Sequence, residues 1–322
     1  MYGHHEGEEE KKYMRNKVSV IGSGFVGTMA AQRIAEKNLA DVMLVDIIEG
    51  IPQGKALDIS QSCPLQEFDV NIKGSNDFGD IQGSHIVVVT AGFPRTPGMT
   101  REKLVLKNGT VVKSVTEKIR EHAPGCIIII VTNPLDVMAH LAWNISGFSE
   151  SRVIGMGGVL DTARYKYFLA EELNVSIRDI DALVLGSHGE TMVPIASCTT
   201  VKGVPVSQFM NKSRIDAVIE RTKKGGAEIV RLLKSGSAWH APSASIVVMV
   251  EAMLHDSRRV MPVSAYLRGE YGINDVHIGV PVKLGSSGIE EIYEIDITDE
   301  ELSALRESAA AMKETYGKLK IL

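Results

Sequence analysis

Short hydrophobic runs alternate with amphipathic segments along the first half of the chain. Two segments, residues 28–37 and 102–121, space their apolar positions as a helix does. The runs that are apolar at nearly every position, as parallel strands buried on both faces are, comprise residues 18–21, 42–45, 85–90 and 127–131. This alternation over the first ~150 residues predicts a doubly wound parallel sheet of the Rossmann type in an α/β protein.

The pattern changes in the second half, which combines longer helices with strands of alternating polarity. Helices are expected at residues 162–172, 214–234, 244–254 and 300–320, and strands at 181–185, 260–266, 277–284 and 291–297. We therefore expect a charged leader over residues 1–16, a dinucleotide-binding domain over 17–151 and an α+β substrate domain over 152–322. No repeat or Pro/Ser-rich linker separates the halves, so they should pack directly around a cleft.

Composition and charge exclude several classes of protein. The 322 residues include 40 acidic and 35 basic ones, and the resulting charge of −5 argues against nucleic-acid binding. The scattered cysteines Cys63, Cys126 and Cys198 form neither a disulfide framework nor a C-x-x-C metal pair, so we expect no metal site and a reducing compartment. No apolar run reaches the ~20 residues that cross a bilayer, and the leader has no signal-peptide core. A cytoplasmic location without membrane contact is expected.

A glycine-rich loop follows the first predicted strand. Gly22 permits a tight turn, Gly24 lets a pyrophosphate approach the backbone, and Gly27 allows close packing of the next helix. Asp46 ends the second strand, where a carboxylate accepts hydrogen bonds from ribose hydroxyls and repels a 2′-phosphate. An ordinary glycine turn is the alternative, but the flanking strand and helix favour nucleotide binding, with NAD preferred over NADP. A methyltransferase or a regulatory NAD sensor could share this loop.

Three polar residues of the second half suggest acid–base chemistry. His188 lies between small residues just beyond a predicted strand, at a sheet edge where ligands bind. Asp161 and Arg164 are three residues apart on a predicted helix, so both side chains project from one face. One could orient a base while the other holds an anion. The alternatives are a surface histidine and a local salt bridge of little energetic value.

Two loops after predicted strands carry further candidates. The segment of residues 92–101 holds Arg95 and Arg101 between glycines and prolines, and is either a solvated connector or a lid that delivers charge on closing. Asn133 follows the strand at residues 127–131, ahead of a proline, so it could equally be a turn residue.

Taken together, these motifs resemble the malate dehydrogenases of the branch most similar to lactate dehydrogenases. The resemblance runs from about Lys17 to Leu322, in the family order and with the family separations. It is carried by the motifs GSGFVG, LVDI, TAGFPRTPGMTR, VTNPLDV, GVLDTAR, GSHGE and GSAWHAPSAS. One departure is Thr96, where a lysine is common; it alters the lid without removing a catalytic group.

The resemblance implies a role for each candidate in a hydride transfer between a 2-hydroxy acid and NAD. His188 is expected to be the acid/base, with Asp161 holding its other ring nitrogen. Arg164 is expected to grip the C1 carboxylate, Arg101 to polarise the C2 oxygen, and Asn133 to position substrate and nicotinamide. Ser237 is expected on the substrate side. The residues expected to bind the cofactor are Gly22, Ser23, Gly24, Phe25, Val26, Gly27, Asp46, Thr90, Ala91, Gly92, Asn108, Val131 and Asn133.

Arg95 bears on the choice of substrate. The corresponding position in lactate dehydrogenases resembles a glutamine, whereas a guanidinium calls for a second carboxylate. A four-carbon dicarboxylate, malate or oxaloacetate, is therefore expected, and lactate dehydrogenase is the alternative. A protein that senses NADH without turnover is a remote one. By analogy we expect a homo-oligomer, a tetramer in preference to a dimer, that acts in the tricarboxylic acid cycle.

Overall fold

The computed structural model describes residues 15–94, 100–234 and 236–319, and for Arg101 the backbone alone. Within this part of the chain, nine strands form one continuous sheet in the order β14-β13-β12-β6-β5-β4-β1-β2-β3. The six parallel strands are β1 (Lys17–Ile21), β2 (Asp41–Val45), β3 (Ile72–Ser75), β4 (Ile86–Val89), β5 (Ile127–Ile130) and β6 (Val153–Gly155). The antiparallel strands are β12 (Arg259–Arg268), β13 (Asn274–Gly285) and β14 (Gly288–Ile292).

The expected α/β class, with a doubly wound first half and an α+β second half, is confirmed. The sheet is nevertheless continuous between the two halves, because β12 pairs with β6 through Ser264 and Gly155. The strand expected at 291–297 is wrong in its extent: β14 ends at Ile292, and the chain runs without regular structure to Thr298. The strand expected at 181–185 is divided between β7 (Ile180–Asp181) and β8 (Val184–Leu185), which belong to different small sheets.

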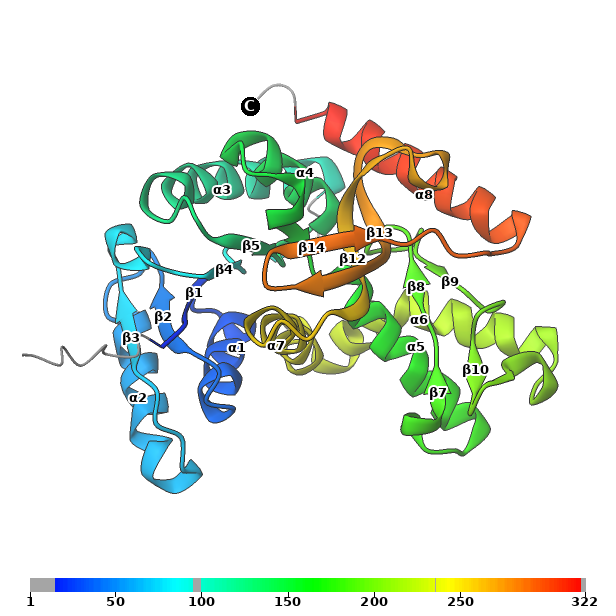
Figure 1. Ribbon diagram of the computed structural model, residues 1–322, viewed down its shortest axis with the longest axis horizontal. Coiled ribbons are helices and arrows are strands. Elements are labelled where there is room, and N and C mark those ends of the chain that lie inside the picture. The colour runs from blue at the N-terminus through cyan, green and yellow to red at the C-terminus, as the bar shows by residue number, and fades with distance from the viewer. Residues whose placement is uncertain (1–14, 95–99, 235, 320–322) are drawn as a thin grey trace, which may run out of the picture.

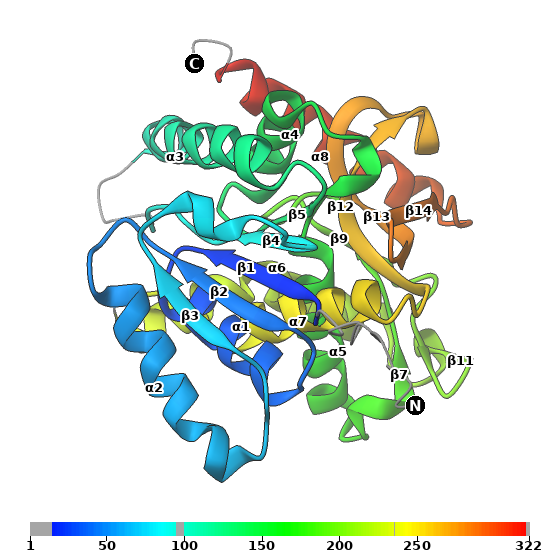
Figure 2. The same cartoon turned by 60° about the vertical axis from the view of Figure 1, so that its left-hand side comes forward.

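Helices cover both faces of the parallel sheet (Figures 1 and 2). On one face lie α3 (Arg101–His122) and α4 (Leu135–Ser146), and on the other lie α1 (Phe25–Glu36), α2 (Ile51–Gln66) and α7 (His240–Leu254). Alternate residues of β4 serve the two faces, since Ile86 and Val88 belong to the core under α1 and α7, and Val87 and Val89 to the core under α3 and α4. Burial on both faces explains why these strands are apolar at every position.

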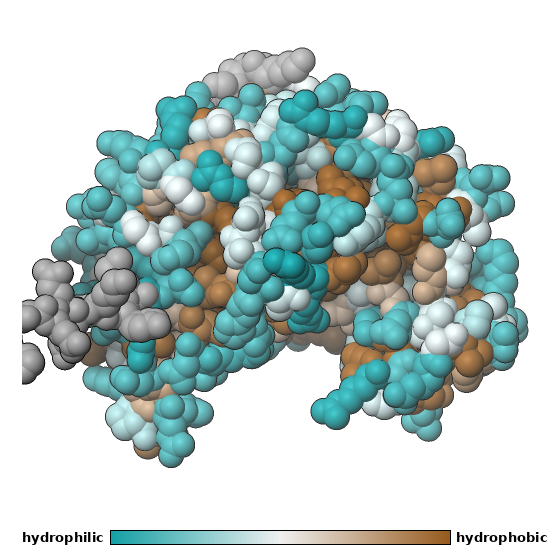
Figure 3. Space-filling view, viewed as in Figure 1, coloured by the Kyte–Doolittle hydropathy of each residue, from teal (hydrophilic) through white to brown (hydrophobic). Residues whose placement is uncertain are grey.

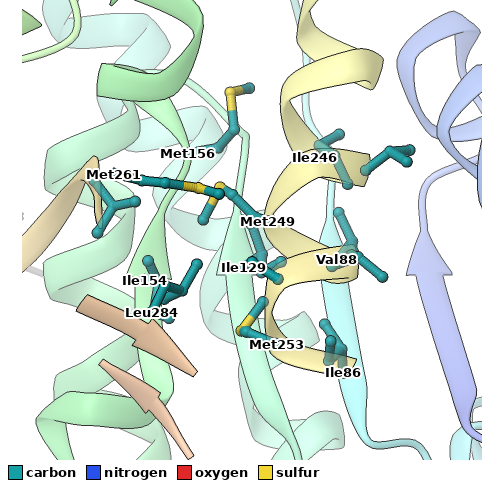
Figure 4. Close-up of a cluster of buried hydrophobic side chains, with 14 of the residues drawn as sticks. Ile86, Val88, Ile129, Ile154, Met156, Ile246, Met249, Met253, Met261 and Leu284 are labelled. Carbon is teal, nitrogen blue, oxygen red and sulfur yellow. The ribbon is translucent and has the colours of Figure 1, made fainter. Parts of the chain in front are cut away.

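The helix α7 ties the second half of the chain to this sheet. Its residues Ile246, Met249 and Met253 pack on Val88 of β4 and Ile129 of β5 (Figure 4). Flexible methionine side chains suit this position, since they fill irregular gaps between a helix and a twisted sheet. The start of α7 is therefore fixed close to the carboxyl ends of the strands.

The remaining elements form a lobe beside the sheet. It contains α5 (Gly157–Leu173), α6 (Lys212–Leu233) and three short antiparallel pairings among β7, β8, β9 (Val193–Pro194), β10 (Thr200–Val201) and β11 (Val204–Pro205). The final helix α8 (Asp299–Gly317) packs on β13. In Figure 3 hydrophilic residues dominate the outer rim of the molecule, and hydrophobic ones show in the middle of that face. Over the described residues, no helix is both long and apolar enough to cross a bilayer.

Candidate active site

The glycine loop leads from β1 directly into α1, as predicted. Gly22 has φ +103°, and a β-carbon there would lie 2.7 Å from the Ala91 nitrogen, so only glycine fits. A β-carbon on Gly27 would lie 2.0 Å from the Gly22 oxygen, which shows how closely α1 approaches the turn. A β-carbon on Gly24 would meet no atom within 4 Å. The loop is therefore open at Gly24 and closed at the other two glycines.

The open side of the loop has groups that could hold the phosphates of a dinucleotide. No side chain caps the start of α1, so its first N–H groups are available to an anion. The hydroxyl oxygen of Ser23 is buried without a hydrogen-bond partner in the described structure, which leaves it able to bind a ligand. These residues fit the pyrophosphate of NAD.

Asp46 lies immediately after β2 and is joined to the same loop. One carboxylate oxygen accepts a hydrogen bond of 2.6 Å from the Ser23 N–H, and the other accepts one of 3.1 Å from the Ile48 N–H. The Lys55 ammonium donates to the Ser23 carbonyl. Charged groups thus bind both main-chain polar groups of Ser23: Asp46 binds its N–H and Lys55 binds its carbonyl. The role of Lys55 was missed from the sequence, because the contact joins residues 32 positions apart.

Two further strand ends contribute to the same part of the candidate site. The Thr90 hydroxyl, after β4, donates to the carbonyls of Ile21 and Gly22. Asn108 on α3 is buried; its amide accepts from the Phe93 N–H at 2.8 Å and donates to the Asn133 carbonyl at 2.7 Å. Asn108 therefore holds the loop after β4 against the loop after β5, where the exposed Asn133 lies.

The acid–base candidates lie together on α5 and in the segment after β8. The His188 Nδ1 lies 2.8 Å from one oxygen of Asp161, and an Arg164 guanidinium nitrogen lies 3.4 Å from the other oxygen. All three side chains are largely buried, with 15% of His188, 2% of Asp161 and 13% of Arg164 exposed. Both Asp161 and Arg164 lie on α5, whose spacing the sequence predicted, but the contact with His188 spans 27 residues. The structure thus brings the predicted pair and its arginine together.

Burial and charge act in opposite directions on His188. Burial disfavours the imidazolium, but the Asp161 carboxylate, through its charge and its hydrogen bond, outweighs this and raises the pKa of His188. Arg164 opposes the rise. Burial also lowers the pKa of Arg164, and Asp161 counteracts that effect. A histidine held in this way is protonated more readily than an equally buried histidine without a carboxylate partner.

Two neighbours fix the position of His188. A β-carbon on Gly157 would lie 2.7 Å from the His188 β-carbon, so the first residue of α5 leaves room for the histidine only as glycine. The His188 N–H donates to a carboxylate oxygen of Asp136 at 2.7 Å. Asp136 is the second residue of α4 and is 3% exposed. The sequence placed Asp136 beside Asn133 but gave no sign of its contact with His188, 52 residues away.

Known proteins with the same sequence pattern identify the family. Residues 16–155 match a model described as lactate/malate dehydrogenase, NAD binding domain, and residues 158–320 match the lactate/malate dehydrogenase, alpha/beta C-terminal domain. The chain belongs to the lactate/malate dehydrogenase family. It is accordingly an NAD-dependent oxidoreductase, and the expected resemblance is confirmed.

Individual members of the family are similar over nearly the whole chain. A malate dehydrogenase of Roseiflexus sp. is 52% identical over 309 residues, which are 96% of this chain and 100% of the relative. A solved malate dehydrogenase from Picrophilus torridus superimposes with a TM-score of 0.92 at 42% identity, covering 95% of this chain and 98% of that one. A lactate dehydrogenase from Cryptosporidium parvum, solved with lactic acid and the cofactor, gives 0.93 at 39% identity, covering 96% and 99%.

For three predicted site residues, Arg95, Arg101 and Ser237, the structure describes little or no side-chain contact. Arg95 lies outside the described residues, and Arg101 begins α3 but its side chain is not described. Ser237 is exposed in the segment before α7. Two residues further along, Trp239 stacks on Phe25 of the glycine loop, with ring centroids 5.1 Å apart. This contact brings the Ser237 segment close to the glycine loop.

The remaining predicted cofactor residues lie in the glycine loop and in the segments after β4 and β5. Val26 packs against the core beneath α1, and Ala91 against the core beneath α3. A β-carbon on Gly92 would lie 2.5 Å from a methyl carbon of Thr132, so the loops after β4 and β5 are in close contact. Val131 directly follows β5 and donates its N–H to the Val89 carbonyl. Among the described residues, no group of three or more His, Cys, Asp or Glu side chains could hold a metal ion.

Proposed function

We propose that this chain is a malate dehydrogenase, which interconverts (S)-malate and oxaloacetate with NAD. The observation that carries the proposal is the buried His188–Asp161 pair with Arg164 on the same carboxylate. The pair supplies a proton acceptor and donor, and the guanidinium supplies an anion-binding group beside it. Relatives over 50% identical carry the name malate dehydrogenase, which supports malate over lactate.

In the oxidation direction His188 removes the proton of the C2 hydroxyl. Its Nδ1 is engaged by Asp161, so the other ring nitrogen faces the substrate as the base. Asp161 fixes this tautomer and stabilises the imidazolium that forms. NAD, when bound, supplies the acceptor for the hydride that leaves C2. In the reduction direction the imidazolium returns its proton to the C2 oxygen.

The arginines account for the choice of substrate. Arg164 binds the C1 carboxylate in a bidentate pair, a geometry that a lysine does not offer. Arg95 binds the second carboxylate of the dicarboxylate, and Arg101 stabilises charge that develops on the C2 oxygen. Asn133 and Ser237 position the substrate and the nicotinamide. Lactate dehydrogenase is the second candidate, since a solved lactate dehydrogenase superimposes equally well.

On the cofactor side, the glycine loop and the start of α1 hold the pyrophosphate, and Asp46 accepts the ribose hydroxyls. The carboxylate is already oriented by the N–H groups of Ser23 and Ile48. The further residues that we propose to contact the cofactor are Thr90, Ala91, Gly92, Asn108 and Val131. We also retain as proposals a domain boundary near residue 151, a homotetramer, a cytoplasmic location and a place in the tricarboxylic acid cycle.

One absorbance assay tests the proposal. NADH consumption is followed with oxaloacetate and with pyruvate, for the wild type and for two variants. His188→Asn should bind NADH normally and lose turnover, whereas wild-type rates in this variant would refute the acid/base role. Arg95→Gln should lose oxaloacetate reduction far more than pyruvate reduction, by ~10⁴ or more in relative specificity. Equal losses with both substrates would refute the role of Arg95.

A further inference from the structure

Three consecutive peptides of the His188 segment are each held by a different element. The Gly186 N–H donates to the Gly279 carbonyl of β13 at 2.9 Å, and the Gly279 N–H returns a bond of 3.1 Å. The Ser187 N–H donates to the Ser308 hydroxyl of α8 at 3.0 Å. The His188 N–H donates to Asp136 of α4 at 2.7 Å. The last bond is the shortest of these, and its acceptor is a carboxyl group.

The position of Asp136 in α4 connects two parts of the proposed site. Asn133 lies three residues before it, and the Asn133 carbonyl is itself held by Asn108. The hydrogen bond that Asp136 accepts from the His188 N–H therefore joins the segment that carries the acid/base to the segment proposed to position substrate and nicotinamide. Proton and hydride transfer must occur in one bound geometry, so the distance between these segments matters for catalysis.

Burying a carboxyl group costs free energy, and one accepted N–H hydrogen bond offsets only part of that cost. Asp136 is 3% exposed, and burial raises its pKa, against the opposing influence of the Ser264 hydroxyl and the His188 N–H. A serine hydroxyl suffices for the neighbouring Ser187 peptide. A hydrogen bond to a carboxylate is roughly twice as strong as one between neutral groups, and it also places negative charge near the imidazole. Stability alone does not require such an acceptor at this place.

We propose that Asp136 is a positioning residue for His188, which fixes the main chain of the acid/base histidine relative to Asn133 and favours its protonated form by charge. The inference rests on the proposed function, because Asp136 can position an acid/base only if His188 moves a proton. His188 is then held by two carboxylates from two helices. Asp161 of α5 orients the ring, and Asp136 of α4 orients the backbone.

The test compares Asp136→Asn and Asp136→Ala with the wild type in oxaloacetate reduction, as a function of pH. Asparagine keeps the size and one acceptor oxygen but removes the charge, and alanine removes both. The Ala variant should lose up to about 10²-fold in kcat through displacement of His188, and Asn should recover most of this loss. Both should retain the NADH affinity of the wild type, measured by fluorescence titration.

The pH profile separates positioning from a merely structural role. Reduction needs the imidazolium, so activity falls as pH rises through the pKa of His188. Without the Asp136 charge the imidazolium is less favoured, so this falling limb should move to lower pH in both variants. Ser308→Ala is the matched control: it loosens the adjacent Ser187 peptide without changing charge, so its falling limb should stay in place.

One outcome would overturn the inference. If both Asp136 variants kept the kcat and the falling limb of the wild type, with a loss of thermal stability alone, Asp136 would be a structural residue. If Asp136→Ala did not fold, the limb of Asp136→Asn would decide the matter by itself. The proposed function would instead be refuted if the wild type did not reduce oxaloacetate, or if His188→Asn kept full activity. The two failures are therefore distinguishable.

Discussion

Acid should destabilise this protein through a histidine that takes no part in the proposed chemistry. His140 lies on α4, is 8% exposed and packs against the ring of Tyr316 at 4.0 Å between centroids. Its Nδ1 lies 3.4 Å from that of the fully buried His277. Burial lowers the pKa of His140 to about 4; Asp275 partly opposes this and Lys313 adds to it. We expect replacement of His140 to make unfolding less dependent on pH.

The sign and size of the effect follow from the difference between the folded and unfolded states. In the unfolded chain the imidazole takes up a proton as pH falls below about 6.5, whereas in the folded protein it stays neutral until about 4. Stability is therefore lost as pH falls through 6.5 and levels off below 4. The loss amounts to about 2 kcal/mol by pH 5 and about 3 kcal/mol in the limit. His277, whose pKa burial also lowers, adds a loss in the same direction.

The assay is guanidinium unfolding at pH 7.5 and pH 5, at one fixed protomer concentration. The quantity compared is the change in unfolding free energy between the two pH values within each protein. In His140→Gln this change should be smaller than in the wild type by about 2 kcal/mol. Packing that the variant loses lowers its stability equally at both pH values, so it cancels in this comparison. His255→Gln, at the exposed end of α7, is the control. An equal pH dependence in wild type and His140→Gln would refute the reasoning.

Two further predictions concern the site itself. Gly157→Ala should displace His188, because the added β-carbon would lie 2.7 Å from the histidine β-carbon. Steady-state kinetics should show a loss of about 10²-fold in kcat. A near-normal rate would mean that His188 shifts without penalty. Asp161→Asn should move the falling limb of oxaloacetate reduction to lower pH, because burial then lowers the pKa of His188 without its main opposing charge. A pH–rate profile measures this, and a limb that stays in place would contradict the assigned cause.

Local rules were enough to predict the cofactor side of the site. Gly22 is required by its positive φ in the turn and Gly27 by its contact with Gly22, both within one strand–turn–helix unit, and Asp46 follows the adjacent strand. The same applies to Asp161 and Arg164, which share a helix face. In each case the chemistry depends on spacing over a few residues or on neighbouring parallel strands, and such spacing can be read directly from a sequence.

Two helices whose polarity does not follow their burial were not predicted. The helix α4 is buried along most of its length, from Leu135 to Ala142, and its polar residues Asp136 and His140 are buried with the apolar ones, so polarity does not mark an exposed face there. The helix α2 exposes Leu57 and Leu65 while burying Ala56 and Ile59, and Pro64 lies inside it. A sequence pattern reports the contrast between buried and exposed positions. Where that contrast is absent or reversed, only the tertiary structure defines the helix.

Contacts between distant segments explain why a second set of residues escaped prediction. Lys55, Asp136 and Trp239 each reach the site through a contact that no local spacing anticipates. Asp136 even lies within a motif that the sequence singled out, three residues from Asn133. Its partner became visible only when the His188 segment was folded against α4.

The shared carboxylate of Asp161 couples substrate binding to protonation in the proposed mechanism. Arg164 lowers the pKa of His188, because its positive charge acts on the same buried cluster. A substrate carboxylate paired with Arg164 neutralises that charge, so it favours the imidazolium. The histidine is then most readily protonated when oxaloacetate is bound, which is when reduction consumes the proton. Burial alone would leave the histidine neutral, and Asp161 in open solvent would do little; the buried cluster of three charges makes both protonation states accessible.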